Sequence, residues 1–581
     1  MCSIIGYHGD RTAAPILIKC LKKMEYRGYD SVGISTQYRN TIITKKKIGT
    51  VSEVNKKMEL DKLPGKIGIG HTRWATHGNV TDINAHPHTS NSGKISVVHN
   101  GIIENYIEIK NELMKMGYKF YSDTDSEVIA NLLQYNFEKT TNVKLSIMNT
   151  VIKLRGQYAF ITILDNKLLA VRYNSPLIIG LKDNERFIAS DVFGVSAEVD
   201  NIIYLNDGSF SILNEKKIQC YGFDGHLIKY TLSNIESNIL TVSKKHYQYF
   251  TLKEIFEQTE SILQVDIKSI NELAKIVSNI KRLYIIGSGT SYNAALIAKY
   301  LLSKFCDKIV EAIVAEEFEI FQNMNRNSAL IAISQSGETA DVINAVNMAV
   351  NANIHAYTIL NIPTSVLAMK CNNIAKTNCG LEIGVAATKS FTSQIASIYI
   401  LVGKMIHVKF IDLHYVSNLI STILKNELEI QNISKSLKNI INIYVLAKGI
   451  HYPIASECAL KLKELSRIHA ESMFGGELKH GAFTLIDNNT HVIVINPQDD
   501  TYDDMVISIH EIKSRGAKII GVSNTYNKLY DYWIKIPNVR DKIIFPLVEI
   551  IPLQLLSYYL AIEKNLDPDH PKNLAKSVTV K

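Results

Sequence analysis

The chain has 581 residues, too many for one hydrophobic core, so we expect two to four domains. Its 46% hydrophobic and 21% charged residues are typical of a soluble globular protein and exclude wholesale disorder. The net charge of +8 is spread along the chain, which weakly favours small anionic substrates and does not support nucleic acid as a partner.

The cysteines and the apolar segments indicate the compartment. Seven cysteines, odd in number and without CxxC spacing, argue against a disulfide framework and a zinc site. The N-terminus lacks an apolar signal core after a basic stretch. The long apolar run IIFPLVEIIPLQLLSYYLAIEK contains two prolines, Glu549 and Gln554, which favour a buried or amphipathic helix over a membrane span. We therefore expect a cytoplasmic protein without a membrane partner.

The chain begins MCSIIG, with a cysteine in second place. A small residue at the start of a buried strand would explain it structurally. The chemical interpretation is that removal of the initiator Met leaves Cys2 at the N-terminus. Its own α-amine, with a pKa near ~7.7–8.0, could then act as general base to its thiol.

Residues 1 to about 235 contain short apolar runs broken by turns, which predict a β-rich layered domain with about two amphipathic helices. One helix is predicted in TDSEVIANLLQYNFEK. Thr124 or Asp125 could cap it, and Val128, Leu132 and Leu133 mark its apolar face.

Beyond a predicted connector near residues 236–250, apolar strands alternate with helical stretches, which predicts parallel sheets covered on both faces. YIIGSGTS and YVLAKGIH each open such a series about 160 residues apart, which predicts two similar α/β domains. The predicted boundaries are 1–238, a connector at 239–265, 266–425, 426–570 and a tail at 571–581.

Four polar stretches of the first domain point to glutamine chemistry: HTRWATHG, NAHPH, VVHNGIIEN and YSDTDSEV. A thiolate that attacks a carboxamide needs oxyanion donors, which the Asn100 amide and the adjacent Gly101 N–H could supply. Arg73 could hold the α-carboxylate of glutamine and Asp125 its α-ammonium. A surface ion pair and a helix cap remain alternatives for these two residues. The histidines are scattered and do not predict a metal.

Two strand-to-helix turns of the second half predict a phosphate site. Hydroxyl and amide side chains stand at successive turns, where helix N-termini favour anions at the carboxyl edge of a sheet. Simple helix caps are the alternative, and neither turn is a dinucleotide or Walker motif. The residues are Thr290, Ser291, Ser334, Gln335, Ser336 and Thr339.

Three further features have ordinary explanations. Glu457, Lys461 and Glu464 have helical spacing, and such charge pairs usually lie on a solvated face. GGELKHG predicts a polar loop that presents His480. Lys576, close to the end of the chain, would normally be a frayed surface group.

Motifs along the whole chain resemble those of known protein families. MEYRGYDSVGI, HTRWATHG, NAHPH, HNGIIEN and TDSEVIA resemble the class II glutamine amidotransferase domain. GSGTS, SQSGET, EIGVAATKSFT, ALKLKE, GELKHG and NLAKSVTV follow in the order of sugar isomerase domains. Together they resemble the isomerising glutamine–fructose-6-phosphate aminotransferase family. This resemblance implies an α+β layered N-terminal-nucleophile hydrolase domain followed by two doubly wound parallel-sheet sugar isomerase domains.

The resemblance also implies an activity: L-glutamine and fructose 6-phosphate give glutamate and glucosamine 6-phosphate, the first step of amino-sugar biosynthesis, without cofactor or metal, in a homodimer. The implied catalytic residues are Cys2, Asn100, Gly101, Glu464, His480 and Lys576. The implied glutamine contacts are Arg73, Thr76, His77 and Asp125, with Trp74 as gate of an ammonia passage. The implied sugar-phosphate contacts are the six turn residues together with Val385 and Ala575.

Two positions depart from the family pattern: Ser288 stands where many members have Cys, and Lys581 where an acidic residue is common. Neither removes a candidate catalytic group. The alternatives are an amidotransferase acting on another ketose phosphate and a sugar-phosphate-binding regulator without turnover. The joint presence of Lys576, Glu464 and His480 argues against the regulator, because binding alone needs none of them.

Overall fold

A computed structural model describes residues 2–75, 77–214, 217–234, 244–320 and 327–578. The chain forms two compact units, Met1–Val242 together with Ala575–Lys581, and Ser243–Leu574. The predicted connector at 239–265 contains helices in its described part, α7 (Phe250–Phe256) and α8 (Gln258–Ser261).

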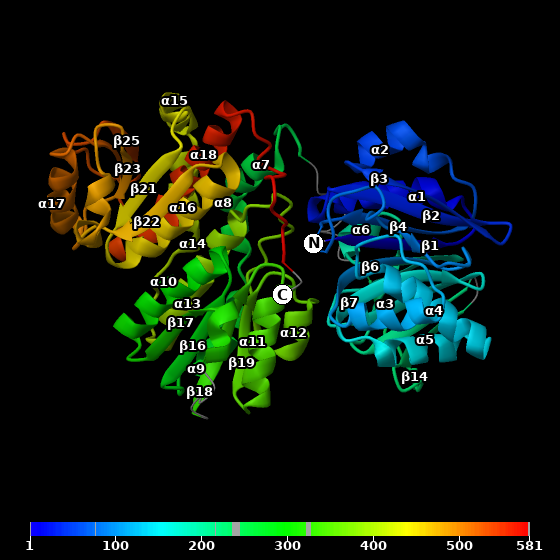
Figure 1. The fold of residues 1–581 in the computed structure, drawn as a ribbon. Helices are drawn as coiled ribbons and strands as arrows, with labels where there is room; N and C mark the ends of the chain where they lie inside the picture. The colour runs from blue at the N-terminus through cyan, green and yellow to red at the C-terminus, as the bar shows by residue number, and fades with distance from the viewer. Residues whose placement is uncertain (1, 76, 215–216, 235–243, 321–326, 579–581) are drawn as a thin grey trace. The chain divides into compact units, whose positions relative to one another are not determined.

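The first unit contains two antiparallel sheets (Figure 1). The first has the order β15-β11-β9-β10-β1-β4-β2-β3 and the second β14-β13-β12-β8-β7-β6-β5. The strands of the first sheet are β1 (Ser3–His8), β2 (Ser31–Tyr38), β3 (Thr41–Ile48), β4 (Ile67–Arg73), β9 (Ile178–Lys182), β10 (Glu185–Ala189), β11 (Asn201–Tyr204) and β15 (Ser233–Asn234). Those of the second are β5 (His88–Thr89), β6 (Ser96–Ile103), β7 (Gly156–Leu164), β8 (Lys167–Tyr173), β12 (Ser209–Leu213), β13 (Ile218–Gly222) and β14 (Leu227–Ile228).

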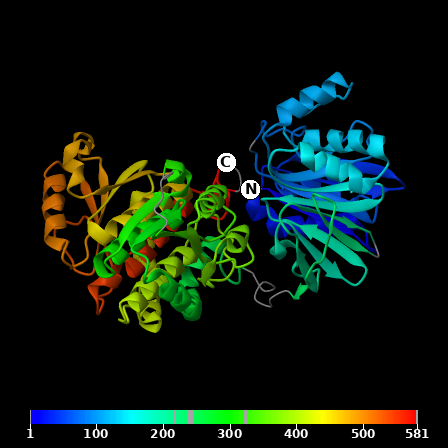
Figure 2. The same ribbon diagram turned by 90° about the horizontal axis from the view of Figure 1, so that it is seen from below.

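The two sheets pack face to face around buried residues such as Ile4, Ile69, Val98 and Ile161. Helix α1 (Ala13–Met24) covers the outer face of the first sheet. Helices α4 (Glu127–Thr140) and α5 (Val143–Lys153) lie side by side on the second (Figure 2). The result is the predicted layered α+β domain: alternate side chains of a strand such as β1 face the other sheet (Ile4) and the covering helix (Ile5 and Tyr7).

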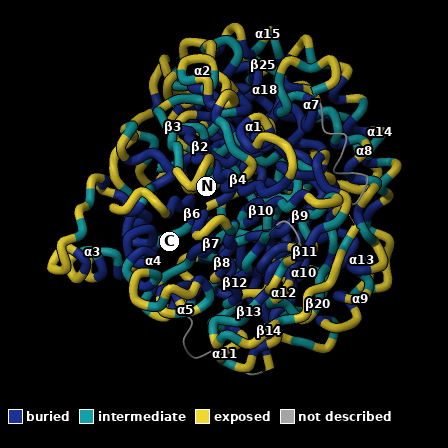
Figure 3. Tube along the Cα trace, turned by 90° about the vertical axis from the view of Figure 1, so that its right-hand side faces the viewer, coloured by how far each residue is buried: buried dark blue, intermediate teal, exposed yellow. Residues whose placement is uncertain are grey.

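The first unit differs from the prediction in its helices. Besides α1, α4 and α5 it has α2 (Val51–Met58), α3 (Tyr106–Lys115) and the short α6 (Val192–Val195), so the expectation of about two helices was wrong. Figure 3 shows exposed residues on α3, whose buried side chains are Ile109 and Leu113. A narrow apolar stripe of this kind is a weak helix signal.

The second unit contains two five-stranded parallel sheets with equivalent orders, β17-β16-β18-β19-β20 and β22-β21-β23-β24-β25. Their first strands begin at Arg282 and Asn442, 160 residues apart, as the sequence repeat predicted. The strands are β16 (Arg282–Gly287), β17 (Ile309–Val314), β18 (Ser328–Ser334), β19 (His355–Leu360), β20 (Asn373–Lys376), β21 (Asn442–Ala447), β22 (His469–Phe474), β23 (His491–Ile495), β24 (Lys518–Ser523) and β25 (Tyr532–Lys535).

Helices of this unit share one apolar core with both sheets. They include α9 (Ile267–Val277), α10 (Thr290–Phe305), α13 (Lys389–Met405), α14 (Leu413–Leu424), α15 (Glu427–Leu437), α16 (Tyr452–Ser466) and α18 (Phe545–Glu563). Helices α11 (Ala340–Asn351) and α12 (Val366–Lys370) pack in a separate cluster on the first of these sheets, and α17 (Tyr502–Lys513) packs in another on the second. The segment Lys542–Glu563 is long and apolar enough to cross a membrane, but 94% of its most apolar window is buried inside the structure. It is a core helix, as its prolines and polar residues predicted.

His451, in the turn after β21, contacts two acidic residues, Asp499 from the segment after β23 and Glu549 of α18; we call these three residues the His451 cluster. The His451 Nε2 lies 2.8 Å from Asp499 Oδ2, and its Nδ1 lies 2.8 Å from Glu549 Oε1. Burial alone would lower the pKa of His451, but Glu549 and Asp499 together raise it to about 10. At the equivalent place in the first repeat, the turn after β16 carries Thr290 and Ser291 instead.

Candidate functional site

Cys2 lies half-buried at the start of β1, beside the end of β4. Its Sγ accepts the backbone N–H of Trp74 at 3.2 Å and lies 3.4 Å from the Trp74 carbonyl oxygen. Burial raises the pKa of the Cys2 thiol, while the Trp74 N–H and Arg73 act in the opposite direction. The thiol is therefore protonated at neutral pH and needs a base before it can attack.

Asn100 and Gly101 are consecutive residues of β6, and Asn100 contacts the backbone of Cys2. The Asn100 side-chain amide donates to the Cys2 carbonyl oxygen at 3.0 Å. Gly101 has φ +128°, and a Cβ there would lie 2.0 Å from the Gln157 carbonyl oxygen. Only glycine fits, because both the conformation and the contact with β7 exclude a side chain. The structure thus brings the predicted oxyanion residue Asn100 into contact with the backbone of the predicted nucleophile.

Arg73 ends β4 and is 2% exposed. Its guanidinium donates to three carbonyl oxygens of the following turn, those of His77 (2.5 Å), Gly78 (3.0 Å) and Asn79 (3.1 Å). Burial lowers the pKa of Arg73, whereas Cys2, Asp30 and Asp125 act in the opposite direction. The alternative of a surface ion pair is therefore wrong, and Arg73 both shapes this turn and places positive charge near the thiol.

Asp125 is buried next to the N-cap of α4, which is Ser126. Its Oδ2 accepts the backbone N–H of Ile103 at 2.8 Å, and its Oδ1 accepts the Ser126 hydroxyl at 3.2 Å. The prediction that Thr124 or Asp125 caps the helix was wrong, because the Asp125 carboxylate turns toward β6 instead. This places a buried carboxylate against β6, the strand that carries Asn100.

The turn after β4 holds the other predicted residues of this site. The Trp74 ring packs edge-on against Tyr29, with centroids 5.7 Å apart. The His77 ring packs edge-on against Tyr106 at 5.9 Å. Thr76 lies outside the described residues. Asp30, which was not among the predicted residues, accepts the Ala75 N–H at 2.9 Å and so holds this turn in place.

Four histidines, His71, His86, His88 and His99, are buried behind this site. The rings of His71 and His86 stack with centroids 4.0 Å apart. Burial lowers the pKa of all four, so they are neutral at physiological pH. Among the described residues, no group of three or more His, Cys, Asp or Glu side chains has the geometry to hold a metal ion.

The first phosphate-type turn joins β16 to α10. Gly289 has φ +55°, and Thr290 and Ser291 open the helix. The Thr290 hydroxyl donates to Glu457 at 3.0 Å and accepts from Lys461 at 3.0 Å. The Ser291 hydroxyl accepts from the Gln394 amide at 3.1 Å.

The second such turn joins β18 to α11. Ser334 ends the strand and its hydroxyl accepts the Gly337 N–H at 2.9 Å, while the Ser336 hydroxyl accepts the Glu338 N–H at 3.2 Å. Thr339 is the N-cap of α11. Because β16 and β18 are neighbouring parallel strands, both turns lie at the same carboxyl edge. The predicted phosphate residues are therefore brought to one edge, where open sheets bind ligands.

Helix α16 adds a buried ionic network to this edge. Glu457 and Lys461 are 0% exposed, so the expected solvated face was wrong. The Lys461 ammonium lies 2.6 Å from Glu464 and 3.2 Å from Glu457, which also accepts from the Asn293 amide at 2.7 Å. Burial opposes the charge of Lys461, but the two carboxylates raise its pKa above the ordinary value. Sequence reasoning did not single out Lys461 as a candidate site residue; the signal was its i,i+4 spacing from Glu457 on a helix whose buried residues are mostly apolar.

The remaining predicted residues are more dispersed. Val385 follows β20 at the same carboxyl edge, and its N–H donates to the Asp569 carbonyl oxygen at 3.4 Å. His480 ends a short 3-10 helix, Glu477–His480, and is exposed. Ala575 and Lys576 are half-buried and belong to the first unit.

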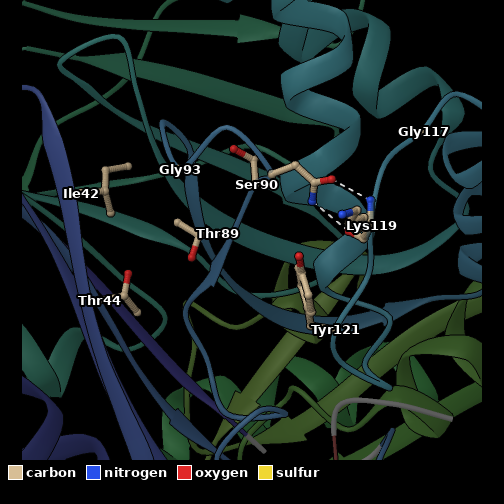
Figure 4. A pocket seen from close by; sticks show the side chains of 9 residues that line it. Ile42, Thr44, Thr89, Ser90, Gly93, Gly117, Lys119 and Tyr121 are labelled. Carbon is tan, nitrogen blue, oxygen red and sulfur yellow. Dashed lines mark hydrogen bonds between the residues drawn. The ribbon is translucent and has the colours of Figure 1, made fainter.

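A separate cavity of about 640 Å³ lies in the first unit. Figure 4 shows Ile42 and Thr44 of β3 on one side of it and Ser90, Lys119 and Tyr121 on the other. Of the residues that the structure describes, the candidate glutamine residues are not part of its lining. We therefore separate it from the Cys2 site.

Comparisons with known proteins agree with this division. A glutamine amidotransferase domain family matches residues 71–195, and the SIS domain family matches 276–404 and 436–564. A protein from Pyrococcus horikoshii is 40% identical over the full length of both chains, and one from Clostridium acetobutylicum is 37% identical, also over both full lengths. Both are named glutamine–fructose-6-phosphate aminotransferase (isomerizing).

Solved structures match the second half. The C-terminal domain of glucosamine-fructose-6-phosphate aminotransferase from Francisella tularensis aligns with a TM-score of 0.52 and 32% identity, over 56% of this chain and all of that one. Tagatose-6-phosphate ketose/aldose isomerase from Escherichia coli aligns with a TM-score of 0.50 and 18% identity, over 56% of this chain and 96% of its own, which shows a shared fold.

Proposed function

The chain belongs to the isomerising glutamine–fructose-6-phosphate aminotransferases, and from this premise we propose which residues carry out each half of the reaction. The enzyme transfers the amide nitrogen of glutamine to fructose 6-phosphate and isomerises the product to glucosamine 6-phosphate. Hydrolysis of the amide is assigned to the first unit and sugar chemistry to the second.

Cys2 is the proposed nucleophile, exposed as the N-terminal residue once the initiator Met is removed. Its neutral α-amine takes the thiol proton, the thiolate attacks the amide carbon of glutamine, and ammonia leaves as a thioester forms. Water then hydrolyses the thioester to glutamate. The observation that supports this assignment is that the Cys2 thiol accepts the Trp74 N–H while the Cys2 carbonyl oxygen accepts the Asn100 amide, so the proposed oxyanion donor contacts the same residue that carries the thiol.

Charge complementarity supports the glutamine contacts. Arg73 supplies the positive charge for the α-carboxylate and Asp125 the negative charge for the α-ammonium. Thr76 and His77, on the turn that Arg73 holds, are assigned to the same amino acid. Trp74 is the proposed gate for ammonia, because its backbone touches the thiol from which ammonia is released.

The two hydroxyl-rich turns are the proposed phosphate site of fructose 6-phosphate. Helix N-termini and hydroxyl donors favour an anion there. Val385 and Ala575 are assigned backbone contacts to the same substrate. The proposed contacts are Thr290, Ser291, Ser334, Gln335, Ser336 and Thr339.

Lys576 is the proposed amine that condenses with the open-chain ketone, releasing water and forming an imine that ammonia then displaces. Glu464 is the proposed carrier of the proton between C1 and C2. The 2.6 Å contact with Lys461 supports this role, because it places a buried cation directly beside the Glu464 carboxylate and fixes where that carboxylate lies. Lys461 is the proposed source of the counter-charge.

His480 is the proposed acid for ring opening. Its exposure on a short helix beside the exposed Phe474 and Leu485 supports a position that a second subunit covers. We accordingly propose a homodimer, which light scattering of the purified protein would test. We also propose that the protein is cytoplasmic.

One assay tests the assignment. Glutamate and glucosamine 6-phosphate are quantified together by mass spectrometry after incubation with glutamine and fructose 6-phosphate. Equal yields are expected from the wild type. Cys2→Ala should release no glutamate yet still bind fructose 6-phosphate, and unchanged glutamate release would contradict the nucleophile assignment.

A further inference from the structure

A closed ring of hydrogen bonds in the second unit joins three segments that are distant in sequence. They are helix α7, the loop at residues 380–388 that carries Val385, and the segment at residues 567–570 that precedes the C-terminal tail. We call it the α7 ring. Its two acidic members, Glu254 and Asp569, are each 1% exposed.

The first half of the ring joins α7 to the loop. The Glu254 carboxylate accepts the backbone N–H groups of Ile383 and Gly384, the latter at 3.1 Å. Gly384 is required here, because a Cβ would lie 2.9 Å from both Glu254 Oε2 and Thr251 Oγ1. The helix therefore holds the backbone immediately before Val385.

The second half joins α7 to the C-terminal segment. The Asp569 carboxylate accepts the N–H groups of Phe250 and Thr251, both at 2.8 Å, and the Thr251 hydroxyl at 2.9 Å. The Thr251 hydroxyl also lies 3.0 Å from the Pro568 carbonyl oxygen. The Val385 N–H closes the ring by donating to the Asp569 carbonyl oxygen at 3.4 Å.

The ring is tied to the phosphate edge through the same loop. Glu382 accepts the N–H groups of Thr388 (2.9 Å) and Ser390 (3.1 Å), which fixes the loop to the start of α13. The same helix carries Gln394, which donates to Ser291 at 3.1 Å. Displacement of the loop would therefore move the Val385 backbone relative to the first phosphate turn.

We propose that Glu254 and Asp569 are positioning residues for the sugar reaction. Glu254 holds the Val385 backbone in position to contact the sugar phosphate. Asp569 anchors the start of the C-terminal tail, in which Lys576 lies seven residues after Asp569. This inference rests on the proposed roles of Val385 and Lys576. Buried carboxylates that each accept two backbone N–H groups hold a loop more rigidly than apolar packing, because each bond is directional and charge-assisted.

The test compares Glu254→Gln and Asp569→Asn with the control Asp412→Asn. Asp412 lies in the same unit and caps α14 by accepting the N–H groups of His414 and Tyr415. Three quantities are measured for each variant: glutamate release from glutamine alone, the KM and kcat for glucosamine 6-phosphate formation, and the yield of the Lys576 adduct trapped by borohydride with fructose 6-phosphate.

Glu254→Gln should raise the KM for fructose 6-phosphate about tenfold and leave kcat within about threefold of wild type, because the substitution displaces the backbone that contacts the phosphate and not the reacting groups. Asp569→Asn should also lower the yield of the Lys576 adduct about tenfold. Glutamate release should stay unchanged in both, and Asp412→Asn should match the wild type in all three quantities.

Thr251→Val is the milder variant if the acidic substitutions prevent folding. It removes one hydroxyl of the ring and should raise the KM about threefold. Suppose that the wild type forms the Lys576 adduct and that every folded variant has a KM and an adduct yield within twofold of those of Asp412→Asn. This result would overturn the positioning roles. A wild type that forms no Lys576 adduct would overturn the proposed role of Lys576 and this inference together.

Discussion

Gly101→Ala tests the geometry beside the nucleophile. Gly101 lies opposite Tyr158 in the β6–β7 ladder and has φ +128°. A Cβ built there meets the Gln157 carbonyl oxygen at 2.0 Å and the Tyr158 Cα at 2.8 Å. Both are backbone atoms, so no side-chain rotation can relieve the overlap. Strand β6 must instead move away from β7 by about 1 Å to restore van der Waals contact.

Two costs add for this substitution. A non-glycine residue at this φ costs about 1–3 kcal/mol, and overpacking against fixed backbone costs about 1–3 kcal/mol more. We expect the free energy of unfolding of the first unit to fall by about 2–6 kcal/mol. A 1 Å displacement of the adjacent Asn100 should lower kcat for glutamine hydrolysis about 100-fold.

Urea unfolding and glutamate release measure the two effects. Gly93→Ala is the matched control, since Gly93 also has positive φ, at +71°, but no described atom lies within 4 Å of its Cβ position. It should lose only about 1 kcal/mol and keep its activity. If Gly101→Ala unfolds like Gly93→Ala and hydrolyses glutamine within twofold of wild type, the tight β6–β7 approach does not hold Asn100 in place.

Three further substitutions test the charged groups. Lys461→Met should lower kcat for glucosamine 6-phosphate at least about 100-fold while glutamate release is unchanged; retained synthesis in a folded variant would contradict its role. Arg73→Lys should raise the KM for glutamine about tenfold or more, because an ammonium replaces a guanidinium that makes several directed bonds; an unchanged KM would contradict the clamp. His451→Gln should destabilise the second unit by about 3–5 kcal/mol at pH 6. The folded-state pKa of His451 is raised from 6.5 to about 10, so this stability is fully present below pH 6.5 and is lost as the pH rises through 10. Urea unfolding of wild type and variant between pH 6 and 10 should show their difference shrinking, and a growing difference would refute the charged imidazole.

The repeated α/β architecture could be predicted because its signals are local. Each strand of the second unit is a short apolar run, and the period of 160 residues between Arg282 and Asn442 is visible directly in the sequence. The turns after β16 and β18 could also be placed, since the carboxyl ends of neighbouring parallel strands share an edge. The finer domain boundaries stay predictions.

Contacts between distant segments could not be predicted. Asp125 has the composition of a helix cap, but its partner is the Ile103 N–H, 22 residues earlier. Glu254 accepts from a loop some 130 residues away, and Asp569 from a helix more than 300 residues away. A single sequence records the side chains that can make such bonds but not which backbone groups will face them.

The buried network of α16 shows how function and burial are related in this chain. Removing Lys461 and Glu457 from water costs several kcal/mol per ion, and apolar residues of similar volume often stabilise a core equally well. Stability alone therefore does not explain the pair. Its position does, because Lys461 contacts Thr290 at 3.0 Å at the carboxyl edge and Glu464 at 2.6 Å on its own helix. A charge that is shielded from water acts more strongly on neighbouring groups, so in the proposed mechanism the desolvation that weakens the fold would strengthen the effect of Lys461 on proton transfer by Glu464.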